Sequence, residues 1–155
     1  MSIPLRALIV EDSEDDTQLL LRVLRRGGYD VTHERVEAAA EMQAALARQA
    51  WDIVLSDYRM PGFSGLAALE ILKESGLDLP FIIISGTIGE DIAVAAMKAG
   101  AHDYLMKGKL ARLGPAIERE LREVEDRRAR RQAEEALAES EARFRSLVEN
   151  ATVGI

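Results

Sequence analysis

The sequence contains no cysteine among its 155 residues. A chain without cysteine forms no disulfide framework, thiol nucleophile or thiolate metal site, so we expect a reducing cytoplasm and chemistry based on oxygen and nitrogen. The chain also lacks an apolar run long enough to span a membrane, because Arg6 interrupts the first run, residues 5–10, and acidic residues follow it at once. We therefore expect neither a signal peptide nor a membrane contact.

Positive charge is in deficit, with 20 Lys+Arg against 27 Asp+Glu and a formal net charge of -7. Proteins bind nucleic acids through a concentrated basic face, so we expect no direct contact with nucleic acid. The arginines at 127, 128, 130 and 131 form a local basic patch, which we interpret as solvated or paired with nearby glutamates. The balance of hydrophobic (48%) and charged (30%) residues is typical of a globular domain.

Short apolar runs and amphipathic segments alternate along the first two thirds of the chain. The apolar runs occupy residues 7–10, 53–55, 81–84 and 104–106, with a weaker run at 29–32. Consecutive apolar positions are typical of strands buried on both faces of a parallel sheet. Helical spacing is found between the runs, at residues 17–26, 38–47, 65–74 and 90–99. This alternation predicts an α/β fold with a doubly wound, five-stranded parallel sheet, whose ligands lie beyond the carboxyl ends of the strands.

From Pro115 to about Asn150 the sequence has almost no glycine, proline or β-branched residue, which predicts one long C-terminal helix. One apolar stripe of this helix contains Ile117, Leu121 and Val124, and a second contains Leu137, Ser140, Phe144 and Leu147. Charged residues break the heptad between the two stripes. We favour a parallel two-chain coiled coil with a phase shift, because a single helix would leave both stripes unburied. A solvated single helix that closes the domain is the alternative.

Acidic residues follow two of the predicted strands. Glu11 and Asp12 come after residues 7–10, and Asp57 comes after residues 53–55. Because the carboxyl ends of parallel strands meet at one edge of a sheet, we expect these carboxylates to converge. Converging carboxylates raise one another's pKa unless a cation neutralises them, and oxygen ligands of this kind suit Mg²⁺. The sequence therefore predicts a magnesium site at this edge.

Ser85 and Lys107 follow two further predicted strands and are expected at the same edge. The charges of three carboxylates, one Mg²⁺ and Lys107 cancel, so the site can accept a phosphoryl group while Asp57 attacks phosphorus. Taken singly, each residue has an ordinary explanation, since an acidic pair after a strand often caps the next helix and a lone lysine is usually a surface residue. The spacing of the whole set favours a functional site.

Four motifs contain these residues: LIVED at 8–12, VLSDYRMPG at 54–62, IIISG at 82–86 and GAHDYLMK at 100–107. Together they resemble the receiver domain of two-component response regulators, over about residues 5–111. The resemblance implies a (βα)5 flavodoxin-like fold, Mg²⁺ as cofactor, and a regulatory switch that catalyses only its own phosphorylation and dephosphorylation. It also implies a sensor histidine kinase or a phosphotransfer protein as the phosphoryl donor.

The resemblance assigns Asp57 as the phosphoacceptor and, with Glu11, Asp12 and the backbone carbonyl of Arg59, as part of the metal site. It implies that Asp12 contacts the metal directly and Glu11 through water.

It further implies that Ser85 moves toward the phosphoryl group, that Tyr104 follows inward as an aromatic switch, and that Lys107 pairs with the phosphate. Receivers usually carry proline after this lysine, whereas Gly108 stands here, which predicts a trans peptide bond and a looser loop.

Residues 134–150 are similar to the linker and opening helix of PAS sensory domains, which continue much as residues 151–155 begin. We therefore expect a receiver domain at 1–113, a helical signalling linker and coiled coil at 114–142, and the start of a PAS domain at 143–155. The long helix is expected to make a homodimer and to relay phosphorylation to an output domain outside this chain, such as a histidine kinase or a cyclic-dinucleotide enzyme.

Three other functions compete with this interpretation. A phosphatase or dehalogenase using Asp57 on an external substrate needs a cap over the site, and no insertion is long enough to form one. An FMN binder needs a phosphate loop after the first strand, where the acidic residues 11–15 would repel a phosphate. A receiver used only as a dimerisation scaffold is disfavoured by the complete set of site residues.

Overall fold

A five-stranded parallel sheet forms the centre of the computed structural model, which describes residues 2–86 and 89–153, with side chains described as far as Asn150. Its strands lie in the order β2-β1-β3-β6-β7. Their bounds are β1 (Ile3–Val10), β2 (Tyr29–Val36), β3 (Ile53–Ser56), β6 (Phe81–Ser85) and β7 (Asp103–Met106). The predicted doubly wound parallel sheet is confirmed, although β1 and β2 are longer than the apolar runs that marked them.

The expected helices are also present. They are α1 (Glu14–Arg26), α2 (Ala39–Arg48), α3 (Gly65–Ser75), α4 (Glu90–Ala99) and α5 (Leu113–Val153). Helix α1 begins earlier than the apolar spacing indicates, because Ser13 caps it: the Ser13 hydroxyl oxygen accepts the backbone N–H of Asp16 at 3.2 Å. The capping residue is therefore Ser13.

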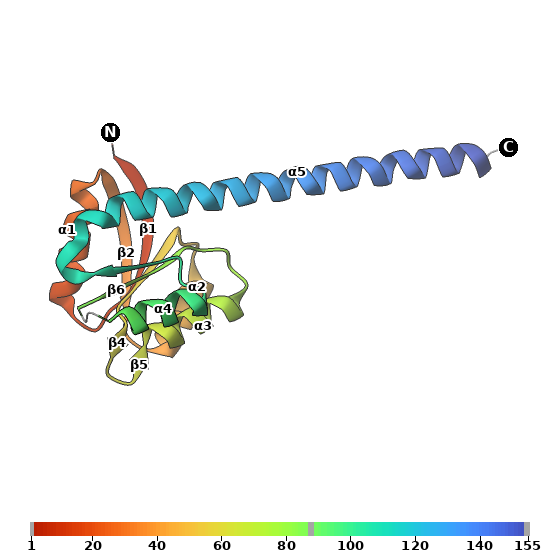
Figure 1. The fold of residues 1–155 in the computed structure, drawn as a ribbon. Helices are drawn as coiled ribbons and strands as arrows, with labels where there is room; N and C mark the ends of the chain where they lie inside the picture. The colour runs from red at the N-terminus through yellow and green to blue at the C-terminus, as the bar shows by residue number, and fades with distance from the viewer. Residues whose placement is uncertain (1, 87–88, 154–155) are drawn as a thin grey trace. The chain divides into compact units, whose positions relative to one another are not determined.

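Two hydrophobic layers enclose the sheet because successive strand residues point to opposite faces. Leu8, Val10 and Val54 belong to the layer that includes residues of α2, α3 and α4. Ala7 and Ile9 belong to the other layer, with residues of α1 and the first turns of α5. Figure 1 shows α2, α3 and α4 gathered on one side of the sheet. The layers hold the strands in register, so that their carboxyl ends share one edge.

Three short elements were not predicted. Strands β4 (Arg59–Met60) and β5 (Phe63–Ser64) form an antiparallel hairpin. Its turn contains Gly62 at φ 72°, a left-handed conformation that glycine adopts without strain. A 3-10 helix, η1 (Lys107–Arg112), connects β7 to α5. Two-residue strands and a single irregular turn are too short to give a periodic signal in sequence.

The chain divides into two compact units, residues up to Leu121 and residues from Arg122 onward. The second unit is a continuous helical segment of α5, and from Arg128 to Asn150 every side chain is exposed. The predicted long helix is confirmed, whereas its pairing in a coiled coil stays a prediction. None of the helices in the described part of the chain is long and apolar enough to cross a membrane.

Candidate functional site

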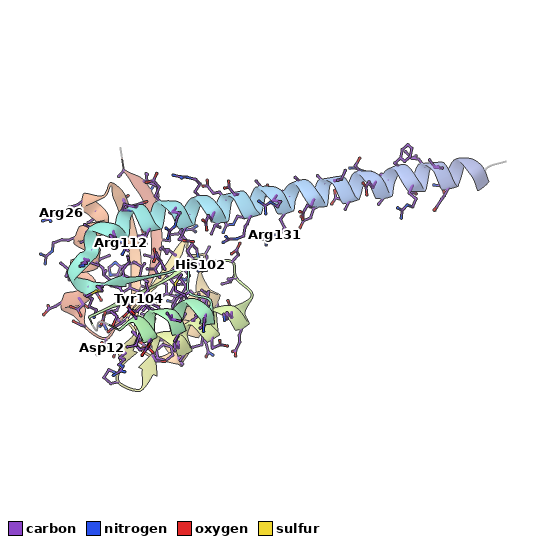
Figure 2. The ribbon with its side chains drawn as sticks, viewed as in Figure 1. Asp12, Arg26, His102, Tyr104, Arg112 and Arg131 are labelled. Atoms are coloured by element: carbon purple, nitrogen blue, oxygen red, sulfur yellow. The ribbon has the colours of Figure 1, made fainter. Side chains whose placement is uncertain are left out.

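Three carboxylates meet at the carboxyl ends of β1 and β3. Glu11 and Asp12 follow β1, and Asp57 follows β3. The strands are paired with Val10 opposite Ser56, and the Asp57 backbone N–H donates to the Val10 carbonyl at 2.8 Å. One carboxylate oxygen from each of the three residues lies within 4.8 Å of the others. The predicted convergence is therefore present, and Figure 2 shows Asp12 at the end of the sheet where the β4–β5 hairpin lies.

Lys107 reaches this cluster from the position directly after β7, the last strand in the sheet order. Its Nζ lies 3.1 Å from Glu11 Oε2 and 3.3 Å from Asp57 Oδ2. A third and shorter contact, 2.7 Å, joins it to Asp16 Oδ2 on α1. The ammonium is therefore shared among three carboxylates that come from different elements.

Burial gives the site an uneven electrostatic character. Glu11 is 2% exposed, and its burial raises the pKa of its carboxyl to about 7, with Asp57 adding to the rise and the Ser13 N–H and Lys107 opposing it. Burial lowers the pKa of Lys107, but hydrogen bonds and charge attraction from Asp16, Glu11 and Asp57 outweigh it and raise the pKa above its usual value. Lys107 is therefore a cation at neutral pH, while Glu11 is poised between its two forms.

The cluster fits a small hard cation. Its donors are carboxylate oxygens, which Mg²⁺ prefers, and their spacing lets one ion bind among them, directly or through water. Asp12 is exposed and Asp57 is 11% exposed, so the cluster opens to solvent on the side of Asp12. Ion and water can reach it without opening the fold.

The backbone around Asp57 is held tightly. The Tyr58 N–H donates to Asp57 Oδ1 at 2.8 Å, which fixes one carboxylate oxygen and leaves Oδ2 toward Lys107. Gly65, the first residue of α3, packs against this loop, because a Cβ there would lie 2.6 Å from the Asp57 carbonyl oxygen. A side chain at residue 65 would therefore displace the residue that carries the predicted nucleophile.

The remaining predicted residues lie beside the cluster rather than in it. Ser85 is buried at the end of β6, paired in register with Met106, next to Lys107. Tyr104 is half-buried on β7 and packs against the hydrophobic layer of α2, α3 and α4. Arg59 begins β4, with its guanidinium 5.9 Å from the centre of the Tyr58 ring. The structure thus brings together Glu11, Asp12, Asp57 and Lys107. Ser85 lies at the edge of this cluster, and Tyr104 lies outside it, against the hydrophobic layer.

The peptide bond between Lys107 and Gly108 is trans, as is every peptide bond in the described part of the chain. A Cβ at Gly108 would meet no atom within 4 Å. The exposed turn after Lys107 therefore has room for a side chain.

Asp16 was missed by the sequence analysis. The predicted charge balance counted three carboxylates against Mg²⁺ and Lys107, but Asp16 adds a fourth carboxylate at the lysine. A signal for it exists, because Asp16 stands four residues before the buried Leu20, whereas Asp15 stands four before the exposed Leu19. Helical phase therefore separates Asp16 from its acidic neighbours.

The chain is similar to known proteins over the region that builds this site. A family model described as the response regulator receiver domain matches residues 7–118. The DNA-binding transcriptional regulator NtrC of Escherichia coli (strain K12) is 40% identical over 99 residues, a match that covers 64% of this chain and 21% of NtrC. The match therefore spans about a fifth of that relative's length.

Solved receiver domains have the same fold. The receiver domain of a putative Luxo repressor protein from Vibrio parahaemolyticus is 26% identical, with a TM-score of 0.69 over 80% of this chain and 96% of that one. The beryllofluoride-activated NtrC4 receiver domain dimer is 28% identical, with a TM-score of 0.67 over 76% and 97% of the two chains. With the carboxylates and lysine in place, the chain belongs to the response regulator receiver family, a phosphoryl-accepting switch of two-component signalling.

Proposed function

We propose that Asp57 is the phosphoryl acceptor of this receiver. The observation that carries this proposal is the contact set of its side chain: one oxygen is fixed by the Tyr58 N–H, and the other lies 3.3 Å from the Lys107 ammonium. Two further carboxylates stand within 4.8 Å. Glu11 has a similar contact set, because its Oε1 accepts the Ser13 N–H and its Oε2 lies 3.1 Å from Lys107. Glu11 is only 2% exposed, however, whereas the Asp57 side chain is 11% exposed and is the more accessible of the two to an incoming phosphoryl group.

Mg²⁺ is the cofactor that the cluster fits. Glu11, Asp12 and Asp57 would hold it, Asp12 directly and Glu11 through water, with the backbone carbonyl of Arg59 as a further ligand. When bound, Mg²⁺ supplies positive charge that offsets the oxygens of an incoming phosphoryl group. Asp16 adds a negative charge at Lys107, so the filled site carries one more negative charge than the sequence predicted.

The phosphoryl donor is a phosphohistidine of a sensor histidine kinase or of a phosphotransfer protein. An Asp57 carboxylate oxygen attacks phosphorus, the bond between phosphorus and the imidazole nitrogen breaks, and that nitrogen keeps the electron pair. Lys107 donates hydrogen bonds to the phosphoryl oxygens. Water later cleaves the acyl phosphate, so the protein catalyses only its own phosphorylation and dephosphorylation.

Ser85 and Tyr104 convert this event into a conformational change. Ser85, at the edge of the cluster, turns toward the phosphoryl group, and Tyr104 follows inward. Tyr104 lines a hollow of about 240 Å³ together with residues of α4 and η1. An inward movement of Tyr104 changes the shape of this hollow. The hollow includes residues of η1, which directly precedes helix α5.

Helix α5 relays the change to an output domain. In our proposal residues 1–113 are the receiver, 114–142 the signalling linker and 143–155 the start of a PAS domain, of which Gly154 and Ile155 lie outside the described residues. The chain is proposed to act in the cytoplasm, without contacting membrane or nucleic acid.

A second copy of the chain is the proposed partner of the exposed stripe on α5. Leu137, Phe144 and Leu147 are 60%, 70% and 69% exposed, at heptad spacing. The NtrC4 receiver forms a dimer when activated, which supports association of receivers in general.

Sedimentation of the whole chain tests this dimer. We expect the chain to associate through α5, and we expect beryllofluoride to strengthen this association or to shift its register. The double change Phe144→Lys and Leu147→Lys should prevent the association. Leu77→Lys, at an exposed leucine outside α5, is the control and keeps the dimer. If the wild-type chain stays monomeric at high concentration with and without beryllofluoride, the proposed dimer is wrong and the tail is only a spacer.

The acceptor itself is tested by fluorine NMR of beryllofluoride, which mimics a phosphoryl group on a carboxylate. We expect a bound signal with Mg²⁺, no bound signal without it, and none in Asp57→Asn with Mg²⁺. A bound signal of full intensity in Asp57→Asn would place the acceptor elsewhere.

A further inference from the structure

Lys107 makes its shortest contact with a carboxylate outside the metal cluster. Its Nζ lies 2.7 Å from Asp16 Oδ2, compared with 3.1 Å from Glu11 Oε2 and 3.3 Å from Asp57 Oδ2. An ammonium has three N–H donors, so these three carboxylates occupy all of them. A phosphoryl oxygen can bind Lys107 only by displacing one of these partners.

The backbone of Asp16 is anchored by the N-terminal cap of α1. It lies in the first turn of α1, where its backbone N–H donates to the Ser13 hydroxyl and the next residue, Thr17, is buried. Its carboxylate is 39% exposed, at the rim of the site. Phosphorylation of Asp57 therefore does not require Asp16 to move, and Asp16 stays in place as an alternative partner for the lysine.

Phosphorylation changes what Lys107 faces. In an aspartyl phosphate the attacking Asp57 oxygen loses its charge, and the negative charge lies on the phosphoryl oxygens further from the carboxylate carbon. The ammonium must turn toward them, and the bond to Asp16 opposes that movement because it is the closest contact.

We propose that Asp16 is a positioning residue that holds Lys107 in the unphosphorylated state and competes with the phosphoryl group for it. This inference rests on the proposed role of Asp57. Asp16 thereby sets how tightly the site retains its phosphoryl group, and no metal or phosphoryl oxygen needs to touch it.

Titration with beryllofluoride at fixed Mg²⁺ tests the competition. Asp16→Asn frees the lysine, and we expect beryllofluoride to bind about two- to five-fold more tightly, the equivalent of one partly exposed ion pair. Asp15→Asn is the matched control, because it removes the same charge from the same turn of α1, where Asp15 is exposed and Asp16 is the residue that contacts Lys107. The gain in Asp16→Asn must exceed the gain in Asp15→Asn.

A double-mutant cycle separates competition from a general charge effect. In a Lys107→Ala background, Asp16→Asn is expected to change binding no more than Asp15→Asn does. Equal effects of the two changes in the wild-type background would overturn the proposal, and so would weaker binding in Asp16→Asn, which would mean that Asp16 presents the lysine. Failure of the wild-type chain to bind through Asp57 would instead overturn the proposed function and this inference with it.

Discussion

Side chains of the same type have different environments in the unit that ends at Leu121 and in the unit that begins at Arg122. In the first unit Phe81 is fully buried and Glu11 is 2% exposed. In the second unit Phe144 is 70% exposed, and Glu139 lies on the exposed helix. Phe81 and Glu11 are buried because distant parts of the chain pack around them. Phe144 and Glu139 lie on a helical segment whose side chains are exposed, so its structure depends on local helix propensity. The first unit buries large apolar side chains within itself, whereas the apolar stripe of the second is exposed, and in our proposal a second copy of the chain covers it.

Paired truncation of the two phenylalanines should give the largest difference. Phe81→Ala is expected to lower the free energy of unfolding of the first unit by about 3–5 kcal/mol, because it leaves a cavity between β6 and its neighbours. Phe144→Ala is expected to change that free energy by less than about 0.5 kcal/mol, since the side chain is exposed. Urea unfolding followed by Trp51 fluorescence measures both. A similar loss in the two variants would mean that the tail is part of the same core.

Removing a carboxylate from the cluster should affect metal binding next most strongly. Asp12→Ala is expected to weaken Mg²⁺ binding by about ten-fold or more and to lower phosphorylation in parallel, since even outer partners of a metal matter this much. Without Mg²⁺ the same variant should melt at a temperature equal to or above that of the wild type, because carboxylate repulsion is relieved. Calorimetric titration and a thermal melt measure the two effects.

Glu141→Ala, on the exposed helix of the second unit, is the control for Asp12→Ala. It removes the same charge and should leave Mg²⁺ binding unchanged. An unchanged metal titration in Asp12→Ala would remove this residue from the site.

The smallest effect expected is a change in the pH dependence of stability. The Glu11 pKa rises from 4.5 to about 7 on folding, chiefly through burial, so the folded chain binds this proton more tightly than the unfolded chain. Without Mg²⁺, this group's contribution is therefore fully present below pH 4.5 and is lost as pH rises through about 7. Glu11→Gln should flatten this part of the stability profile. Glu139→Gln should retain it, and a profile unchanged in Glu11→Gln would contradict the burial argument.

Much of the fold follows from local patterns. Apolar runs predicted all five strands of the sheet, because strands buried on both faces need apolar residues at consecutive positions. The ends of β1 and β2 were less predictable. Arg6 and His33, for example, are polar residues that lie in these strands, with register partners in the sheet but no apolar character. The β4–β5 hairpin was invisible, since two residues define no period.

The site was predictable where residues follow strands, and it was not where they lie on a helix. Glu11, Asp57 and Lys107 were located by topology alone, because parallel strands end at one edge. Asp16 depends on the rotational phase of α1, which Ser13 fixes by capping the helix at that residue. The C-terminal helix was predictable because helix formation depends on local sequence, whereas its pairing depends on contacts that local sequence does not define and stays a prediction.

Intact mass after incubation with acetyl phosphate tests the chemistry of the first unit most directly. With Mg²⁺ the wild-type chain should gain the mass of one phosphoryl group, and without Mg²⁺ it should gain none. Asp57→Asn keeps the volume of the side chain and deletes the nucleophile, so we expect it to fold and to gain no mass. Full labelling of Asp57→Asn under the same conditions would contradict the assignment of Asp57 as the phosphoryl acceptor.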